Sequence, residues 1–506
     1  MSDSEPTRAT SADIGWICLS DTHFGAENSL LSDLPTGSIK VDVIQPSPVL
    51  EKLVECLAAL VATNSGANKP TLVLNGDILE MALAEDNVAA MVFDRFIDLA
   101  FAGSQPIFDD TIVYLAGNHD HHMWETARER QYSDYVAGRP PDSPLEAPWH
   151  ATLMFERDGG GHPQAELLTA LVQRRGGEQL TVNVAYPNYA VGDDNRVVIF
   201  HHGHFIEALY RLMSTLRAAI FPGQQAGPDI WDWESDNFAW IDFFWSSLGR
   251  SGQAGEDVGL IYDCLQQPAS IGLLASNLAA AAVGRIPHLP RLLLRPARWA
   301  IRPIIRRLAT KVLTHERAHA DILLTAGAEK GLDAFLKGPL RRQLERERPG
   351  GSNSDVNFVF GHTHKPFERV QRVDGFRNPV SVYNTGGWVV DTLTTKPVQG
   401  ASIVVVDTAY QVASIRVYNQ SDNTSDYRVT VGPDNSLLAQ QLKGVIDFSA
   451  GAWADLSASV ASAVAVRHDA LGEIIKRGSE PAIPASTAPT DAKASKPADR
   501  HISPSG

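Results

Sequence analysis

Residues 356–364 read Val-Asn-Phe-Val-Phe-Gly-His-Thr-His, an apolar run that ends in two histidines. On an extended chain, His362 and His364 are two positions apart and point the same way. At the end of a strand, such a pair can present two imidazoles to metal ions. Taken alone, it is more often a solvated pair or one satisfied within the core. The interpretation changes because four earlier apolar runs also end in polar residues, and these supply the other kinds of ligand.

The first part of the chain alternates predicted strands with predicted helices. Apolar runs at 14–19, 71–74 and 111–115 predict buried strands, and helical spacing predicts helices at 48–62 and 87–101. This alternation favours a sheet of parallel strands covered by helices, in which polar functional residues collect beyond the carboxyl ends of the strands. The residues at those ends are Asp21 and His23, then Asp77, then Asn118, His119 and Asp120.

The later strands complete the set. A run at 196–200 ends in His201-His202-Gly203-His204, and further strands are predicted at 180–185, 379–384, 401–406 and 412–418. The candidate ligands from all strand ends are Asp21, His23, Asp77, Asn118, His202, His362 and His364.

This ligand set combines oxygen and nitrogen donors without a thiolate. It suits manganese, iron or zinc and is too rich in nitrogen for a calcium site. Seven ligands are too many for one four-coordinate zinc but fit two ions that share a carboxylate. Two such ions, about 3.5–4 Å apart, can hold a bridging hydroxide and clamp both oxygens of an in-line displacement at phosphorus. The residues therefore predict metal-assisted hydrolysis of a phosphoester.

Each position also has a structural explanation of its own. Asp77 could cap a helix from a turn, and Asn118 and His119 could bond to loop backbone. A single Asp-x-His, such as Asp21 and His23, can arise by chance. Their joint occurrence, each after an apolar strand, favours one assembled site.

The series Asp21-Thr22-His23, Gly76-Asp77, Gly117-Asn118-His119-Asp120, His202-Gly203-His204 and Gly361-His362-Thr363-His364 resembles the motifs of the calcineurin-like metallophosphoesterases, in the family order. The resemblance covers roughly residues 14–204 and 355–418. It implies an α/β fold, a four-layer αββα sandwich of two mixed sheets flanked by helices, with a mostly helical insertion.

The resemblance also implies roles for the site residues. One metal would be held by Asp21, His23 and His364, the other by Asn118, His202 and His362, and Asp77 would bridge them. His202 is favoured over His201 and His204 because the family uses the first histidine of the His-Gly-His motif. His119 would stabilise the phosphoryl oxygens or protonate the leaving group, which is general-acid work suited to histidine. Asp120 would orient His119, as carboxylates do for imidazoles at metal sites.

Three neighbouring residues have simpler predicted roles. His121 and His122 are expected to be exposed loop histidines, with at most one of them in contact with the site. Asn384 precedes Gly386 and Gly387 and is expected to belong to a turn.

The predicted organisation follows from composition and pattern. It comprises a disordered leader at 1–13, a first core part at 14–204, a helical insertion at 205–350, a second core part at 351–445, a helical segment at 446–477 and a disordered tail at 478–506, rich in Pro, Ala, Ser and Lys.

The insertion carries an unusual charge pattern. Residues 285–317 hold nine Lys or Arg residues and one Glu, interleaved with Leu, Ile and Trp, in a chain whose net charge is −15. Such a stretch could lie on an anionic membrane surface, steer nucleic acid or an acidic substrate, or pack against the acidic aromatic residues 229–242 to form a cap. The favoured interpretation is a cap. Membrane contact is the second interpretation, and nucleic-acid binding is the least favoured. Four prolines, at 287, 290, 296 and 303, break the region into short helices.

Composition narrows the cellular setting. The three cysteines, Cys18, Cys56 and Cys264, are odd in number and lack zinc-site spacing, so reduced thiols in a cytoplasmic protein are expected. No signal-peptide pattern and no apolar run of about 20 residues is present, so the protein is expected in the cytoplasm, with peripheral contact at the inner membrane face as an option.

The sequence thus predicts a two-metal phosphoester hydrolase, acting on a phosphodiester, phosphomonoester or pyrophosphate bond. The alternative class is a scaffold protein that keeps the fold without turnover, and the complete ligand set weighs against it. A membrane-surface phospholipid or lipid-linked pyrophosphate is the alternative substrate to a soluble one. Oligomeric state is left open.

Overall fold

The computed structural model describes residues 13–66, 68–102, 106–156, 161–221, 227–247, 321–419, 421 and 427–479. The predicted leader up to residue 12, the basic stretch 285–317, Cys264 and the tail from 480 lie outside these residues. Among the described residues, no helix combines the length and apolar character needed to cross a bilayer.

The first of two mixed β-sheets has seven strands in the order β12-β11-β10-β1-β2-β3-β4. β1 to β4 are mutually parallel, and β10 joins β1 in antiparallel orientation. The strands are β1 (Ile14–Leu19), β2 (Thr71–Asn75), β3 (Thr111–Leu115), β4 (Thr181–Val184), β10 (Gly400–Asp407), β11 (Val412–Asn419) and β12 (Thr430–Gly432).

The second sheet has five strands in the order β5-β6-β7-β9-β8, with β6, β7 and β9 parallel. The strands are β5 (Asn188–Gly192), β6 (Arg196–His201), β7 (Asp355–Phe360), β8 (Phe367–Gln371) and β9 (Val380–Asn384).

Side-chain alternation along the strands stacks the two sheets face to face. In β1, Ile17 and Leu19 belong to the core under the helices of the first sheet, whereas Cys18 belongs to the core between the sheets. In β7, Phe358 and Phe360 pack toward the insertion, whereas Val359 faces the first sheet. β1 and β7 therefore contribute side chains to a core on each face, which explains why their runs are largely apolar.

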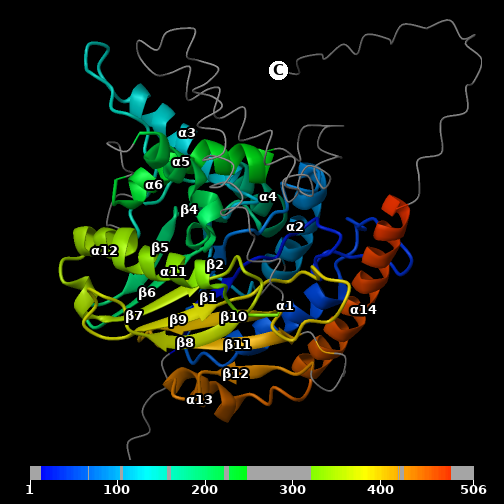
Figure 1. Cartoon of the computed structure of the whole chain (residues 1–506). Coiled ribbons are helices and arrows are strands. Elements are labelled where there is room, and N and C mark those ends of the chain that lie inside the picture. The colour runs from blue at the N-terminus through cyan, green and yellow to red at the C-terminus, as the bar shows by residue number, and fades with distance from the viewer. Residues whose placement is uncertain are drawn as a thin grey trace, which may run out of the picture.

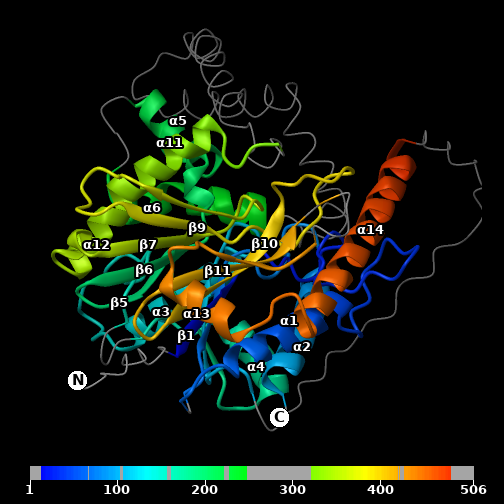
Figure 2. The same ribbon diagram turned by 90° about the horizontal axis from the view of Figure 1, so that it is seen from below.

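Helices cover both outer faces (Figures 1 and 2). The first sheet is covered by α1 (Pro48–Val61), α2 (Asp86–Phe101), α4 (Glu166–Gly176), α13 (Leu437–Val445) and α14 (Ala452–Ser479), and α3 (His122–Ala137) packs at its rim. α1 begins where predicted because Ser47 accepts a hydrogen bond from the Leu50 amide and Pro48 occupies the first turn. The architecture is therefore the predicted αββα sandwich.

The described parts of the insertion are helical and cover the second sheet. They comprise η1 (His204–Ile206), η2 (Ala208–Arg211), α5 (Leu212–Ile220), α6 (Ile230–Ile241), η3 (Asp242–Ser247), α11 (Ala326–Phe335), η6 (Leu336–Leu340) and α12 (Arg341–Glu347), and the short η7 (Gly351–Asn353) leads into β7. Leu332 and Phe335 of α11 lie in the same core as Phe358 of β7.

Candidate metal centre

The predicted ligands gather beyond the carboxyl ends of β1, β2, β3, β6 and β7, and all are buried. Six non-glycine residues in the described chain have positive φ, and five of them are predicted ligands: Asp21, His23, Asp77, His362 and His364. This conformation is unfavourable for residues with a Cβ atom and tends to concentrate at functional sites. The backbone strain therefore marks the same place as the motifs.

Asp21, His23 and His364 form one compact group. The Nε2 atoms of His23 and His364 are 3.2 Å apart, and His364 Nε2 lies 3.4 Å from Asp21 Oδ1. The Asp21 carboxylate is fixed by the amide of His362, which donates to Oδ1 over 2.8 Å.

Asp77, His202 and His362 form a second group. His202 Nε2 lies 3.4 Å from Asp77 Oδ2, 3.3 Å from His362 Nδ1 and 3.1 Å from Asn118 Oδ1. Asp77 Oδ2 is also 3.7 Å from His23 Nε2, so this carboxylate lies between the two groups. That is the place predicted for a bridging ligand.

The outward nitrogen of each imidazole has its own acceptor. Three carboxylates take this role: Glu80 Oε2 with His23 Nδ1, Glu207 Oε1 with His362 Nε2 and Asp391 Oδ2 with His364 Nδ1, each at 2.7 Å. The fourth acceptor is the carbonyl of Asn75, 3.3 Å from His202 Nδ1. Because the outward nitrogens carry the protons, the inward nitrogens present lone pairs, as metal-bound histidines do.

These inward lone pairs fit metal ions. Two donors about 2.1 Å from one ion, at tetrahedral or octahedral angles, lie about 3.0–3.4 Å apart. The inward contacts within each group span 3.1–3.4 Å. Lone pairs facing each other at that distance repel unless a cation lies between them. Together, the buried groups can hold metal ions.

Glycines allow the ligands to approach so closely. A Cβ on Gly361 would lie 2.0 Å from Asp21 Oδ2, and one on Gly76 would lie 2.4 Å from the His202 ring. Any side chain at either position would displace a ligand, which accounts for Gly in front of both His362 and Asp77.

His119 lies beside the two groups. Its Nδ1 is 2.8 Å from Glu80 Oε1, and its amide donates to Asp77 Oδ1 over 2.7 Å. With Nδ1 directed to the Glu80 carboxylate, proton transfer by this ring would use Nε2. Glu80 therefore connects His119 to the ligand His23 through its two oxygens, and these three residues also form a compact group of metal-ligand type.

Asp120 does not orient His119, contrary to our expectation, because Glu80 occupies that position. The Asp120 carboxylate instead accepts hydrogen bonds from the amides of Gly117 and Ile78, at 2.6 and 2.7 Å, and from the hydroxyl of Tyr114. It ties the end of β3 to the end of β2.

The expected exposure of His121 is also wrong. His121 is fully buried, and its Nε2 lies 2.8 Å from Glu234 Oε1 of α6. His122 is part-buried and begins α3. Sequence gave no signal for this because the covering residues come from the insertion, more than a hundred positions away.

The histidines at 201, 202 and 204 have different environments. His201 packs on Phe335, with ring centroids 4.5 Å apart, and His204 Nε2 lies 3.3 Å from the Tyr186 hydroxyl. Of the histidines between 201 and 204, His202 is the one that joins the ligand group. Asn384 has the expected turn role, since its Oδ1 accepts from the Gly386 amide over 2.8 Å.

The electrostatics reflect the packing of charge. Burial alone would raise the pKa of Asp77, but His202, His119 and His23 hold it well below its usual range. Burial alone would lower the pKa of His202, but Asp77 raises it to about 9. Protons on this centre are therefore in competition with metal ions.

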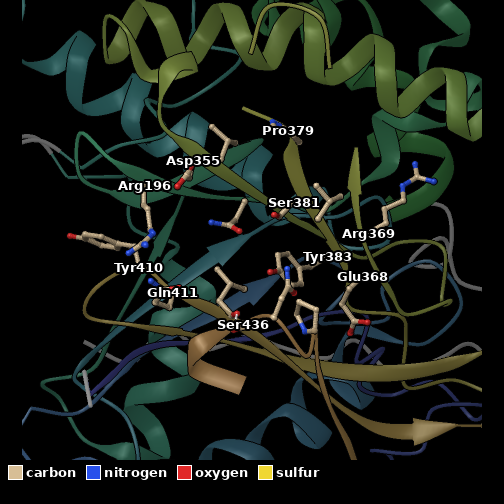
Figure 3. Close-up of a pocket in the computed structure, with 16 residues that line it drawn as sticks. Arg196, Asp355, Glu368, Arg369, Pro379, Ser381, Tyr383, Tyr410, Gln411 and Ser436 are labelled. Carbon is tan, nitrogen blue, oxygen red and sulfur yellow. Dashed lines mark hydrogen bonds between the residues drawn. The ribbon is translucent and has the colours of Figure 1, made fainter. Parts of the chain in front are cut away.

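Three cavities lie away from the centre, one of them, of about 470 Å³, between residues 30–49 and α14. A second, of about 450 Å³, is lined by residues at the start of β7, such as Asp355, whereas the ligands follow its end (Figure 3). Its polar lining includes Arg196, Glu368 and Ser381 from the second sheet. The third, of about 620 Å³, lies against the first turn of α6.

Fold and site together define an αββα protein with a buried centre able to hold metal ions. No family model and no curated protein matches the chain. Among solved structures, it is similar to a crystal structure of phosphopantetheinyl hydrolase from Mycobacterium tuberculosis, with 12% identity, covering 74% of this chain and 90% of that chain, at a TM-score of 0.24. A TM-score of 0.24 does not establish a common fold, so no function is inferred from this similarity. The resemblance to calcineurin-like metallophosphoesterases is not confirmed and rests on the motifs.

Proposed function

We propose that this chain is a phosphoester hydrolase that depends on two divalent metal ions, of the calcineurin-like type that its motifs resemble. The observation that carries the proposal is the position of Asp77 Oδ2, 3.7 Å from His23 Nε2 and 3.4 Å from His202 Nε2. A carboxylate in this position, between two ligand groups, could bind both of two adjacent metal ions.

The ligands divide into two sets. Asp21, His23 and His364 would hold one ion, Asn118, His202 and His362 the other, and Asp77 both. The two metal ions would polarise the phosphoryl group and lower the pKa of a water molecule so that it can attack phosphorus at neutral pH. Manganese, iron and zinc all suit the donor set.

The chain itself supplies orientation and the proton. Glu80 accepts the Nδ1 proton of His119, and we assign to Nε2–H the proton that passes to the departing oxygen. Glu207, Asp391 and the Asn75 carbonyl each accept from the outward nitrogen of a ligand histidine, so the inward nitrogen is the one that would bind a metal ion. His119 and the two metal ions would also stabilise the negative charge that develops on the phosphoryl oxygens.

Hydrolysis of model esters tests this proposal. Metal-stripped protein, re-supplied with manganese, iron or zinc, should cleave bis-p-nitrophenyl phosphate or p-nitrophenyl phosphate, and the ratio of the two rates reports diesterase against monoesterase character. Turnover should disappear in Asp77→Ala. In His119→Ala, turnover of phenyl phosphate, whose poor leaving group needs the proton, should fall by about 10²- to 10⁴-fold for a general acid. Asp434→Asn, which changes an exposed carboxylate paired with Lys443, is the matched control. Stoichiometric metal binding without turnover on any ester would favour the scaffold alternative.

The membrane-surface substrate is a separate question. The hypothesis is based on the basic stretch 285–317, which lies outside the described residues. Flotation with anionic liposomes, of the full chain and of a chain lacking 285–317, would test membrane binding. The membrane hypothesis fails if neither form binds.

A further inference from the structure

The insertion contacts the candidate acid loop directly. Two consecutive residues after Asp120 are held by the segment 230–247: His121 Nε2 lies 2.8 Å from Glu234 Oε1, and the amide of His122 donates to Ser246 Oγ over 3.0 Å. His122 Nδ1 is also 3.4 Å from Asp242 Oδ1. These contacts join parts of the chain more than a hundred residues apart.

Glu234 is the centre of this interface. It is fully buried, and its second oxygen accepts a hydrogen bond of 3.0 Å from the Tyr186 hydroxyl. Burial alone would lower the pKa of His121, but Glu234 and Asp242 raise it to about 10. The contact is therefore a buried ion pair, and such a pair is costly to break because one partner is left unpaired.

The loop that carries His119 is held on both flanks. On one flank, Asp120 binds the amides of Gly117 and Ile78. On the other flank, the imidazole of His121 lies 2.8 Å from Glu234 Oε1, and the neighbouring amide of His122 donates to Ser246 Oγ over 3.0 Å. His119 lies between them, and its ring must reach the leaving oxygen within hydrogen-bond distance to act.

We propose that Glu234 is a positioning residue for His119, so that the insertion, through α6, completes the active site of the core. This inference rests on the proposed phosphoesterase function. In the step concerned, the oxygen of a hydroxide ion, formed from water that has released one proton to solvent, forms a bond to phosphorus. The bond from phosphorus to the leaving oxygen breaks, and the His119 Nε2 proton passes to that leaving oxygen.

Leaving-group dependence separates positioning from a general structural defect. Glu234→Gln removes the charge with little change in volume. In the manganese-loaded full chain, Glu234→Gln should reduce kcat/KM for phenyl phosphate by about tenfold or more. The phenolate released from this ester is a poor leaving group and needs the proton. The rate with 2,4-dinitrophenyl phosphate, whose leaving group departs without the proton, should fall less than about threefold on the same reasoning. His119→Ala should show the same pattern, and metal content should stay at the wild-type value.

Two further variants serve as a control and as a substitute for Glu234→Gln. Asp236→Asn, on the same helix but paired with Arg217 of the insertion, should leave both rates unchanged. If Glu234→Gln fails to fold, Tyr186→Phe removes only the hydroxyl that donates to Glu234 and should produce a smaller change of the same kind. Equal loss on both esters, or no loss on either, overturns the inference while the proposed function stands.

Hydrogen exchange gives a reading that does not depend on turnover. The amides of 118–123 should exchange faster in Glu234→Gln than in Asp236→Asn or wild type. If the wild type cleaves no ester, the proposed function fails, and unchanged exchange would show separately that Glu234 does not hold the loop.

Discussion

Glu80 offers a sharp test of the centre because its two oxygens have different partners. Oε1 accepts from the amides of Ala82 and Leu83, at 3.0 and 2.9 Å, and faces His119. Oε2 faces His23. In Glu80→Gln, the amide oxygen should keep the Oε1 position, where two backbone donors require an acceptor. The NH₂ group must then face His23 Nδ1.

That orientation reverses the tautomer of one ligand. His23 Nδ1 would have to accept from the new NH₂, so its proton moves to Nε2, the nitrogen that faces His364 and Asp77. A protonated nitrogen cannot ligate a metal. Loss of such a supporting contact typically weakens metal affinity about 10- to 100-fold, or about 1.4–2.7 kcal/mol. The loss should fall on the ion held with Asp21, not on the one held with His202.

Metal titration measures this selectivity. Competition with a chromogenic chelator, with elemental analysis, should show two ions in the wild type and selective weakening of one in Glu80→Gln. Glu207→Gln is the matched variant, since Glu207 supports His362 of the other group. The reasoning is refuted if Glu80→Gln retains both affinities, or if the two variants weaken the same ion.

Three further outcomes follow from the described contacts. Saturating the metal-stripped protein with manganese at about 100 times its dissociation constant should raise the free energy of unfolding by about 2.7 kcal/mol per site, measured by urea titration, and EDTA should reverse it. His121 has a folded-state pKa of about 10, above its unfolded value, so its stabilisation is complete below about pH 6.5 and is lost as pH rises to 10. The thermal midpoint of wild type should therefore fall more steeply over that range than that of Glu234→Gln, and parallel curves would contradict the ion pair. Arg467→Ala leaves the buried carbonyls of Ser29 and Ser32 without their donor, which should cost about 3 kcal/mol in urea unfolding; a loss under about 1 kcal/mol would be against this.

The ligand positions were predictable because each follows an apolar strand directly. The strands β1, β2, β3, β6 and β7 are buried on both faces, so their apolar runs end abruptly where the site begins. Their alternation with helices then indicated the layered architecture. Local pattern and global fold agree at these elements.

The supporting carboxylates were not predictable in the same way. Glu207 and Asp391 lie on loops without a motif and reach His362 and His364 only in the folded chain. Glu80, three residues after Asp77, was the one a closer reading of the sequence could have proposed. The helix α3 escaped prediction because its buried residues, such as Met123 and Trp124, cluster in its first turns and form no continuous stripe.

The pairing of β1 with β10 has a consequence for how the protein is made. β1 is an inner strand of its sheet, yet one of its neighbours is β10, and Ile14 pairs with Asp407. Chains grow at about 5–20 residues per second, so the ribosome needs about 20–80 seconds to supply this partner. During that time, one edge of β1 has no native neighbour, which exposes it to pairing with other chains. Yield of folded protein should therefore depend on how quickly synthesis proceeds from β1 to β10 and on whether a chaperone shields the early half.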